Sequence, residues 1–180
     1  MDRSNIALVV CCAVAAGLLP GGAGCSSATI ALKEKLGIPK REQLVARVED
    51  ARDEQEKAKE QFASALAEFL AVTGAKGGEL ETRYNALNRE YERSESRAGS
   101  VRGRITDVER VGEALFKEWK AELEQYPSPA MRGASQNQMN DTRRQYDRLI
   151  GMMQTAAAKM EPVLVAFKDQ VLFLKHNLNA

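Results

Sequence analysis

Residues 44–72 read LVARVEDARDEQEKAKEQFASALAEFLAV, and the spacing of their apolar side chains decides the fold. A helix brings residues three and four positions apart onto one face. Apolar residues recur at this spacing, with one polar member, while Glu49, Asp53 and Lys57 fall outside the line. The stretch therefore predicts one long amphipathic helix. Its apolar face, the first stripe, consists of Leu44, Val48, Ala51, Gln55, Ala58, Phe62, Ala65, Phe69 and Val72.

Two further stripes follow, separated by breaks at Thr73–Gly78 (TGAKGG) and Tyr126–Pro129 (YPSP). Prolines and glycines in such short breaks end helices. The second stripe consists of Leu80, Tyr84, Leu87, Tyr91, Ser94, Ala98, Val101, Ile105, Val108, Gly112, Leu115 and Trp119. The third consists of Met139, Thr142, Tyr146, Leu149, Met153, Ala156, Met160, Val163, Phe167, Gln170 and Leu174, broadened by Ile150, Ala157, Leu164, Val171 and Leu178.

Short breaks between long helices place neighbouring helices antiparallel. A seven-residue apolar repeat sustained over this length is typical of left-handed coiled-coil packing. We therefore expect an all-α fold, an elongated antiparallel three-helix coiled-coil bundle that follows an N-terminal signal peptide. The expected organisation is a lipoprotein signal peptide at 1–24, a lipid-anchored tether with a short helix at 25–38, and the helical domain at 39–180.

Two irregularities lie within the stripes. Gly99 and Gly103 each weaken a helix interior by about 1 kcal/mol relative to alanine, and they indicate either a hinge or close helix crossing or, more simply, a thin part of the core. Pro162 lies in the third stripe, yet the heptad spacing continues through it. We therefore expect a kink near 158–162 and no reversal of the chain.

The N-terminus is typical of a secreted protein. Residues 6–19 carry no charge and form an apolar run too short to span a bilayer but suited to a signal peptide. The tripeptide Ala23-Gly24-Cys25 resembles the end of a bacterial lipobox, which implies acylation of Cys25 and cleavage before it. Gly22 stands where that motif usually has leucine, so ordinary cleavage that leaves an unmodified thiol is the alternative.

Beyond Cys25, residues 30–36 are expected to form two turns of helix ended by Gly37, with Ile38 and Pro39 completing the C-cap pattern. If Cys25 is acylated, Ser26 resembles the residue that follows it in lipoproteins sent to the outer membrane. The expected location is thus the outer membrane, with the protein facing the periplasm.

The last segment, residues 163–178, is apolar on nearly every face and needs cover on several sides. Lys168, Asp169 and Lys175 interrupt it, so it is not predicted to span a membrane. Either the chain lacks a partner helix because it is shortened, or an oligomer, a protein partner or a membrane covers this face. The candidate partner surface consists of Val163, Phe167, Val171, Leu172, Phe173, Leu174 and Leu178.

Residues that carry chemistry are scarce. His176 is the only histidine, so no histidine-pair metal motif can be built and we expect no metal, no cofactor and no catalytic residues. Lysine plus arginine (26) nearly balances aspartate plus glutamate (25), which argues against a nucleic-acid partner. Arg143, Arg144 and Arg148 form a small basic patch, interpreted as solvated surface or as a contact for an acidic partner or lipid headgroup.

Three blocks resemble a known family: REQLVARVEDARDEQEKAKEQFASALAEF at 41–69, EALFKEWKAELEQY at 113–126 and KMEPVLVAFKDQVLFLKHNLNA at 159–180. They are similar to the bacterial lipoproteins grouped as domain-of-unknown-function family twenty-nine fifty-nine. The resemblance implies a helical, periplasm-facing lipoprotein of undetermined function. Members usually continue into another helical stretch, which implies that this chain is shortened.

The sequence leaves three function classes open. We expect a structural or adaptor coiled coil in the cell envelope, anchored to the outer membrane and without catalytic activity. The alternative is a lipid- or cell-wall-binding module that uses the apolar face of residues 163–178 with the basic patch. An enzyme ranks third, because no convergent polar cluster is visible.

Overall fold

The computed structural model describes residues 25–71 and 79–178, with side chains from residue 28 onward. These residues form five helices: α1 (Cys25–Lys35), α2 (Lys40–Ala71), α3 (Glu79–Leu123), α4 (Pro129–Ala158) and α5 (Met160–Leu178). No strand occurs within these ranges, so the all-α prediction is confirmed. The predicted signal peptide at 1–24, the break at Thr73–Gly78 and the C-terminal Ala180 lie outside the described residues.

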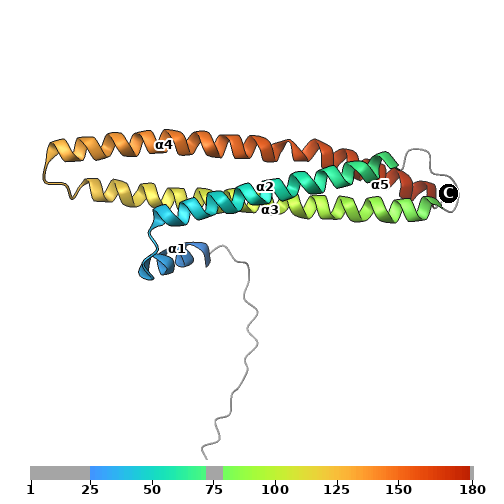
Figure 1. Ribbon diagram of the computed structural model, residues 1–180, viewed down its shortest axis with the longest axis horizontal. Coiled ribbons are helices and arrows are strands. Elements are labelled where there is room, and N and C mark those ends of the chain that lie inside the picture. Colours follow the sequence, from blue (N-terminus) through green and yellow to red (C-terminus); the bar gives the residue numbers. More distant parts are fainter. Residues whose placement is uncertain (1–24, 72–78, 179–180) are drawn as a thin grey trace, which may run out of the picture.

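The long helices lie side by side in an elongated assembly (Figure 1). α3 runs antiparallel to α2, and α4 runs back along α3, with α5 continuing in the direction of α4. α3 packs along α2 and along both α4 and α5, whereas α2 contacts α4 and α5 only sparsely. α3 is therefore the central helix of the assembly, and α1 sits to one side near the start of α2.

The turn between α3 and α4 follows from its sequence. Ser128 caps α4, because its Oγ accepts a hydrogen bond from the backbone N–H of Met131 at 3.4 Å. Pro129 occupies the first helical position, where its missing N–H is not needed and its fixed φ suits the helix. The predicted break at Tyr126–Pro129 thus separates two antiparallel helices.

The expected count of three helices differs from the five described. One of the five is α1, which corresponds to the short helix predicted before Gly37, and the one added helix arises because the third stripe is divided at Lys159 between α4 and α5. Pro162 has no N–H to offer the carbonyl of Ala158, and Lys159 instead donates to Ala156 O at 3.3 Å, which tightens the last turn of α4. The chain keeps its direction through this point, as expected for a kink.

The interface between α2 and α3 is built from small side chains. Ala51, Ala58 and Ala65 recur every seven residues on α2 and are completely or almost completely buried. Ser94 and Ala98 of α3 are also fully buried. Small residues at heptad spacing let two helix backbones approach closely over their length.

The two glycines that suggested a crossing are not part of this interface. A methyl group added at Gly99 or Gly103 would meet no atom within 4 Å, and both residues are exposed. The close crossing interpretation of these glycines is therefore wrong, because Ser94 and Ala98 supply the small surface. The interpretation of residues 94–103 as a thin part of the core fits through the small buried side chains of Ser94 and Ala98, because both glycines lie on the exposed side of α3.

The core between α3 and the α4–α5 pair consists of larger residues. Val101, Ile105 and Val108 of α3 meet Tyr146, Ile150 and Met153 of α4 in one cluster. Leu87 of α3 meets Val171 and Leu174 of α5 in a second cluster. The first and second stripes are buried or half-buried at every described position.

The third stripe is buried along one of the two rows that its predicted members and broadening residues contain. Its members Ala156 and Val163 are exposed, whereas the broadening residues Ile150, Ala157, Leu164 and Val171 are buried. Because a four-three spacing can be read from either of two adjacent apolar rows, the sequence did not distinguish them. The buried row continues through the kink from α4 into α5: Tyr146, Ile150, Met153, Ala157, Met160, Leu164, Phe167, Val171 and Leu174, of which Met160 is half-buried.

Candidate functional site

Helix α1 ends in the C-cap predicted from its sequence. Gly37 has a φ of 83°, in the left-handed region that glycine adopts without steric penalty. Its N–H donates to Glu34 O at 2.9 Å, and the N–H of Ile38 donates to Lys33 O at 3.0 Å. This pair of bonds is the Schellman motif. The chain turns here, and α2 begins at Lys40 directly after Pro39.

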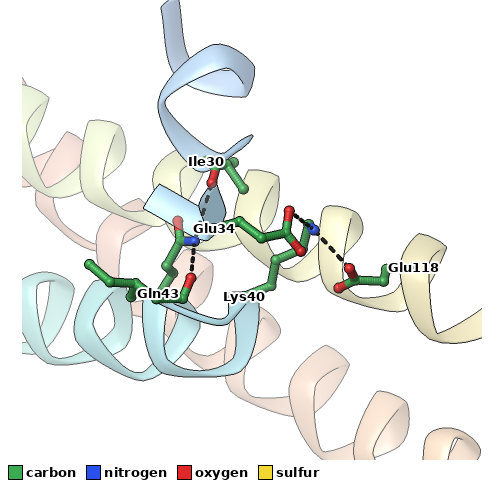
Figure 2. Close-up of polar contacts among 6 residues, drawn as sticks. Ile30, Glu34, Lys40, Gln43 and Glu118 are labelled. Carbon is green, nitrogen blue, oxygen red and sulfur yellow. Dashed lines mark hydrogen bonds and ion pairs between the residues drawn. The ribbon is translucent and has the colours of Figure 1, made fainter. Parts of the chain in front are cut away.

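The turn brings α1 against the first residues of α2 in what we call the corner, formed by Ile30, Glu34, Lys40, Gln43 and Glu118 (Figure 2). Gln43 is buried, and its Nε2 donates to the carbonyl oxygens of Ile30 at 3.2 Å and Ile38 at 2.9 Å. One side chain of α2 thereby holds both the middle of α1 and the residue after its cap.

Lys40 joins three helices at the corner. Its Nζ lies 2.5 Å from Glu34 Oε2 in α1 and 3.0 Å from Glu118 Oε1 in α3. Burial disfavours the charged lysine, but the two hydrogen bonds to carboxylates outweigh it, so the pKa of Lys40 is raised. The pKa of Glu34 is lowered, chiefly because Lys40 donates a hydrogen bond to it. Both groups are therefore charged at neutral pH.

The sequence analysis did not find the corner. Lys40 lies one position before the place that the four-three spacing of the first stripe would occupy next, at Arg41, so the sequence pattern did not mark it. Cys25, the predicted lipid-attachment residue, is the first residue of α1, and its side chain lies outside the described part of the chain. Its acylation stays a prediction.

The predicted partner surface is divided by the fold. Phe167, Val171 and Leu174 are buried within the chain itself. Among the remaining predicted residues, Phe173 is 60% exposed, and Val163, Leu172 and Leu178 are also exposed. A partner can thus reach the second group without opening the bundle, and cannot reach the first. Val165, which is not among the residues of the predicted surface, is exposed on α5 as well.

An open groove of about 390 Å³ lies between α2 and the α4–α5 junction. We call it the apolar groove. Most of the side chains that line it are apolar, with Lys59 and Lys159 among the polar ones. α2 and α5 meet beyond it through the rings of Phe69 and Phe167, whose centroids are 5.5 Å apart. Its apolar lining consists of Ala58, Phe62, Val101, Ala156, Ala157, Met160 and Val163.

The predicted basic patch does not offer three unpaired charges. Arg143 pairs with Asp147 at 2.9 Å and covers the ring of Phe116, 4.9 Å from its centroid, while Arg144 pairs with Asp141. Local pairing of this kind is common on solvated helix surfaces. His176 is exposed near the end of α5.

No group of three or more His, Cys, Asp or Glu residues suited to a metal ion occurs within residues 25–71 and 79–178. In the same ranges, no helix combines the length and apolar character needed to cross a bilayer.

The fold and these surfaces define an elongated helical-bundle protein with a short docked N-terminal helix. The family described as "Protein of unknown function (DUF2959)" matches residues 30–180. The chain belongs to this family, and the resemblance of its three blocks is confirmed. No curated protein and no solved structure matches the chain significantly.

Proposed function

We propose that the protein is a lipoprotein of the bacterial cell envelope, cut before Cys25, acylated there and held on the periplasmic side of the outer membrane. The lipobox-like Ala23-Gly24-Cys25 supports the proposal, and Cys25 belongs to the helix α1. Because the corner ties that helix to α2 and α3, an anchored cysteine would hold the whole bundle close to the membrane.

In this proposal the bundle acts as a non-catalytic adaptor. Its long helices form a coiled coil of three parts, in which α2 and the continuous α4–α5 pair both pack on α3. The observation that carries the adaptor role is the apolar groove together with the exposed apolar residues Leu66 and Leu70 of α2 and Val163 and Phe173 of α5. An exposed apolar surface of this kind marks an interaction site in a soluble bundle. The position of the groove between α2 and the α4–α5 junction suits a partner helix.

Site-specific photocrosslinking in living cells tests the adaptor role. A photoreactive residue at Val163 or Phe173 should capture the same envelope protein, whereas the same residue at the exposed Asn137 of α4 should not. Equal capture from all three positions, or no capture from the first two, would contradict the proposed partner surface.

Anchoring is tested separately with Cys25→Ser. The variant should move from the membrane fraction to the soluble periplasm, and the intact mass of the parent protein should show acyl chains. Membrane fractionation that is unchanged by the substitution would remove the proposed anchor and leave the groove result unaffected.

The alternative role is lipid binding, and the composition of the groove favours it specifically. The groove volume lies in the range of about 300–1,000 Å³ that is usual for small-molecule sites. Lys159 supplies positive charge for an anionic headgroup, whereas Lys59 pairs with Glu56 of the groove lining at 2.9 Å. Native mass spectrometry of the purified protein should then show a noncovalent lipid adduct. Val163→Trp should remove the adduct, while Val165→Trp, an exposed control outside the groove lining, should retain it.

A further inference from the structure

Helix α1 has two chemically different faces. Ile30 and Glu34, four residues apart, face the corner, where the Ile30 carbonyl accepts from Gln43 and Glu34 pairs with Lys40. Leu32 and Leu36, also four residues apart, lie on another face and are 57% and 72% exposed. Within a helix, such i, i+4 pairs share one face. The outward face of α1 thus carries two large exposed apolar side chains, beside the smaller exposed Thr29.

The charges on α1 are also distributed unevenly. Glu34 is its only acidic residue, and this residue is turned toward Lys40 and neutralised there. Lys33 and Lys35 are the basic residues of its last turn. Ile38, exposed just after the cap, extends the apolar surface. Leucines flanked by lysines, with the carboxylate directed elsewhere, complement a bilayer surface that carries anionic headgroups.

The position of α1 in the chain also indicates that its outward face contacts a membrane surface. Leu32 is seven residues from Cys25, which corresponds to about 10 Å along a helix. If Cys25 bears acyl chains, as we propose above, the outward face of α1 is held beside the bilayer at a high effective concentration. A weak apolar and electrostatic contact is then sufficient to keep the helix on the surface.

We propose that α1 is an interfacial helix that lays Leu32, Leu36 and Ile38 on the membrane surface, with Lys33 and Lys35 at the headgroups. This inference rests on the proposed lipid anchor. The interfacial helix would fix the orientation of the bundle on the membrane, which acyl chains alone would not do. Acyl chains on a loose tether would leave the bundle free to rotate, whereas α1 bound to the bilayer and fixed to α2 and α3 through Lys40 and Gln43 sets the orientation of the bundle.

Fluorescence quenching by lipid tests the proposal on the protein matured in cells. The full chain is expressed, purified from membranes and reconstituted in vesicles of phosphatidylglycerol and phosphatidylethanolamine in equal amounts, with and without bromine on the acyl chains. Trp119→Phe supplies a background without tryptophan, and Leu32→Trp introduces the probe. Met152→Trp is the matched control, because Met152 is 62% exposed but lies on α4. A parallel pair that keeps Trp119 guards against misfolding of the background.

Brominated lipid should quench the probe at position 32 by about twofold or more, because interfacial helices bury their apolar face about 5–10 Å deep. The probe at position 152 should be unaffected. Absence of quenching at position 32, or equal quenching at both positions, would overturn the proposal. If the probe at position 32 becomes buried as the protein concentration rises but is not quenched by lipid, the outward face of α1 instead contacts a second copy of the chain. The intact mass reports acylation independently. Acylated protein with an unquenched probe refutes only this inference, and protein without acyl chains refutes only the anchor.

Discussion

Three glycines of α3 provide a sharp test of the packing, because the same substitution should act in opposite directions. Gly99 and Gly103 have open space where a methyl group would be added. At Gly112, the added carbon would lie 2.5 Å from Cζ and 2.6 Å from Oη of Tyr146. The Tyr146 ring has little freedom to withdraw: it packs edge-on against Phe116 at 5.4 Å, and its hydroxyl donates to Glu109 O at 3.3 Å.

The expected magnitudes follow from two opposing terms. Alanine is favoured over glycine in a helix interior by about 1 kcal/mol. Gly99→Ala and Gly103→Ala should therefore each raise the free energy of unfolding by about 0.5–1 kcal/mol. Overpacking a buried site costs about 1–3 kcal/mol, so Gly112→Ala should lower the free energy of unfolding by up to about 2 kcal/mol after the gain in propensity is subtracted.

Urea unfolding followed by circular dichroism measures all three variants against the parent protein. Tyr146→Ala removes the ring that the added methyl group would meet. In this background, Gly112→Ala should raise the free energy of unfolding through its higher helix propensity, and a double-mutant cycle measures the difference from the single variant. If Gly112→Ala stabilises the protein as much as Gly103→Ala does, Tyr146 does not pack on α3 as described, and the alignment of α3 with α4 is incorrect.

Three further predictions concern other contacts. Gln43→Ala leaves two carbonyls at the corner without their donor, so amide hydrogen exchange in α1 should accelerate, with the exposed Gln125→Ala unchanged. Ala65→Leu should destabilise the protein by about 1–3 kcal/mol in a urea melt because Ala65 is fully buried, whereas Ala67→Leu, which is exposed, should change the free energy of unfolding by less than about 0.5 kcal/mol. Burial raises the pKa of Tyr146 to about 12 from 10.0, with the charge of Glu109 contributing, so the folded state holds this proton more tightly than the unfolded state. The stability from Tyr146 should be complete below pH 10 and be lost as the pH rises toward 12; Tyr146→Phe should reduce that loss, and an unchanged pH profile of unfolding would contradict it.

The sequence predicted the helical class and most of the core because those features depend on local spacing. The first and second stripes are buried or half-buried wherever the structure describes them. The third stripe is different, because two adjacent apolar rows share its residues and only contact with α3 selects between them. Val163 and Val171 look equivalent in the sequence, yet Val163 lines the groove and Val171 joins the core with Leu87.

The candidate sites were harder to predict than the helices. The C-cap at Gly37 was visible, since Gly-Ile-Pro is a local signal. The ion pair of Lys40 with Glu118 joins residues far apart in the sequence, and no local pattern indicates such a pair. Likewise, the inward direction of Glu34 depends on how α1 turns onto α2. Composition alone could not separate the apolar outward face of α1 from its polar inward face.

The two proposed surfaces constrain each other geometrically. The groove residues Gln55 and Phe62 lie 15 and 22 positions after Lys40 along α2, or about 20–35 Å from the corner at the helical rise. If α1 lies on the bilayer, one helix diameter of about 10 Å separates the corner from the headgroups. The groove then lies no more than about 45 Å from the membrane surface, whatever the tilt of the bundle. A helix docked in the groove must therefore belong to a protein that comes within about 45 Å of the membrane surface. If crosslinking from Val163 captured a partner that cannot come so close to the membrane, α1 could not be the membrane contact.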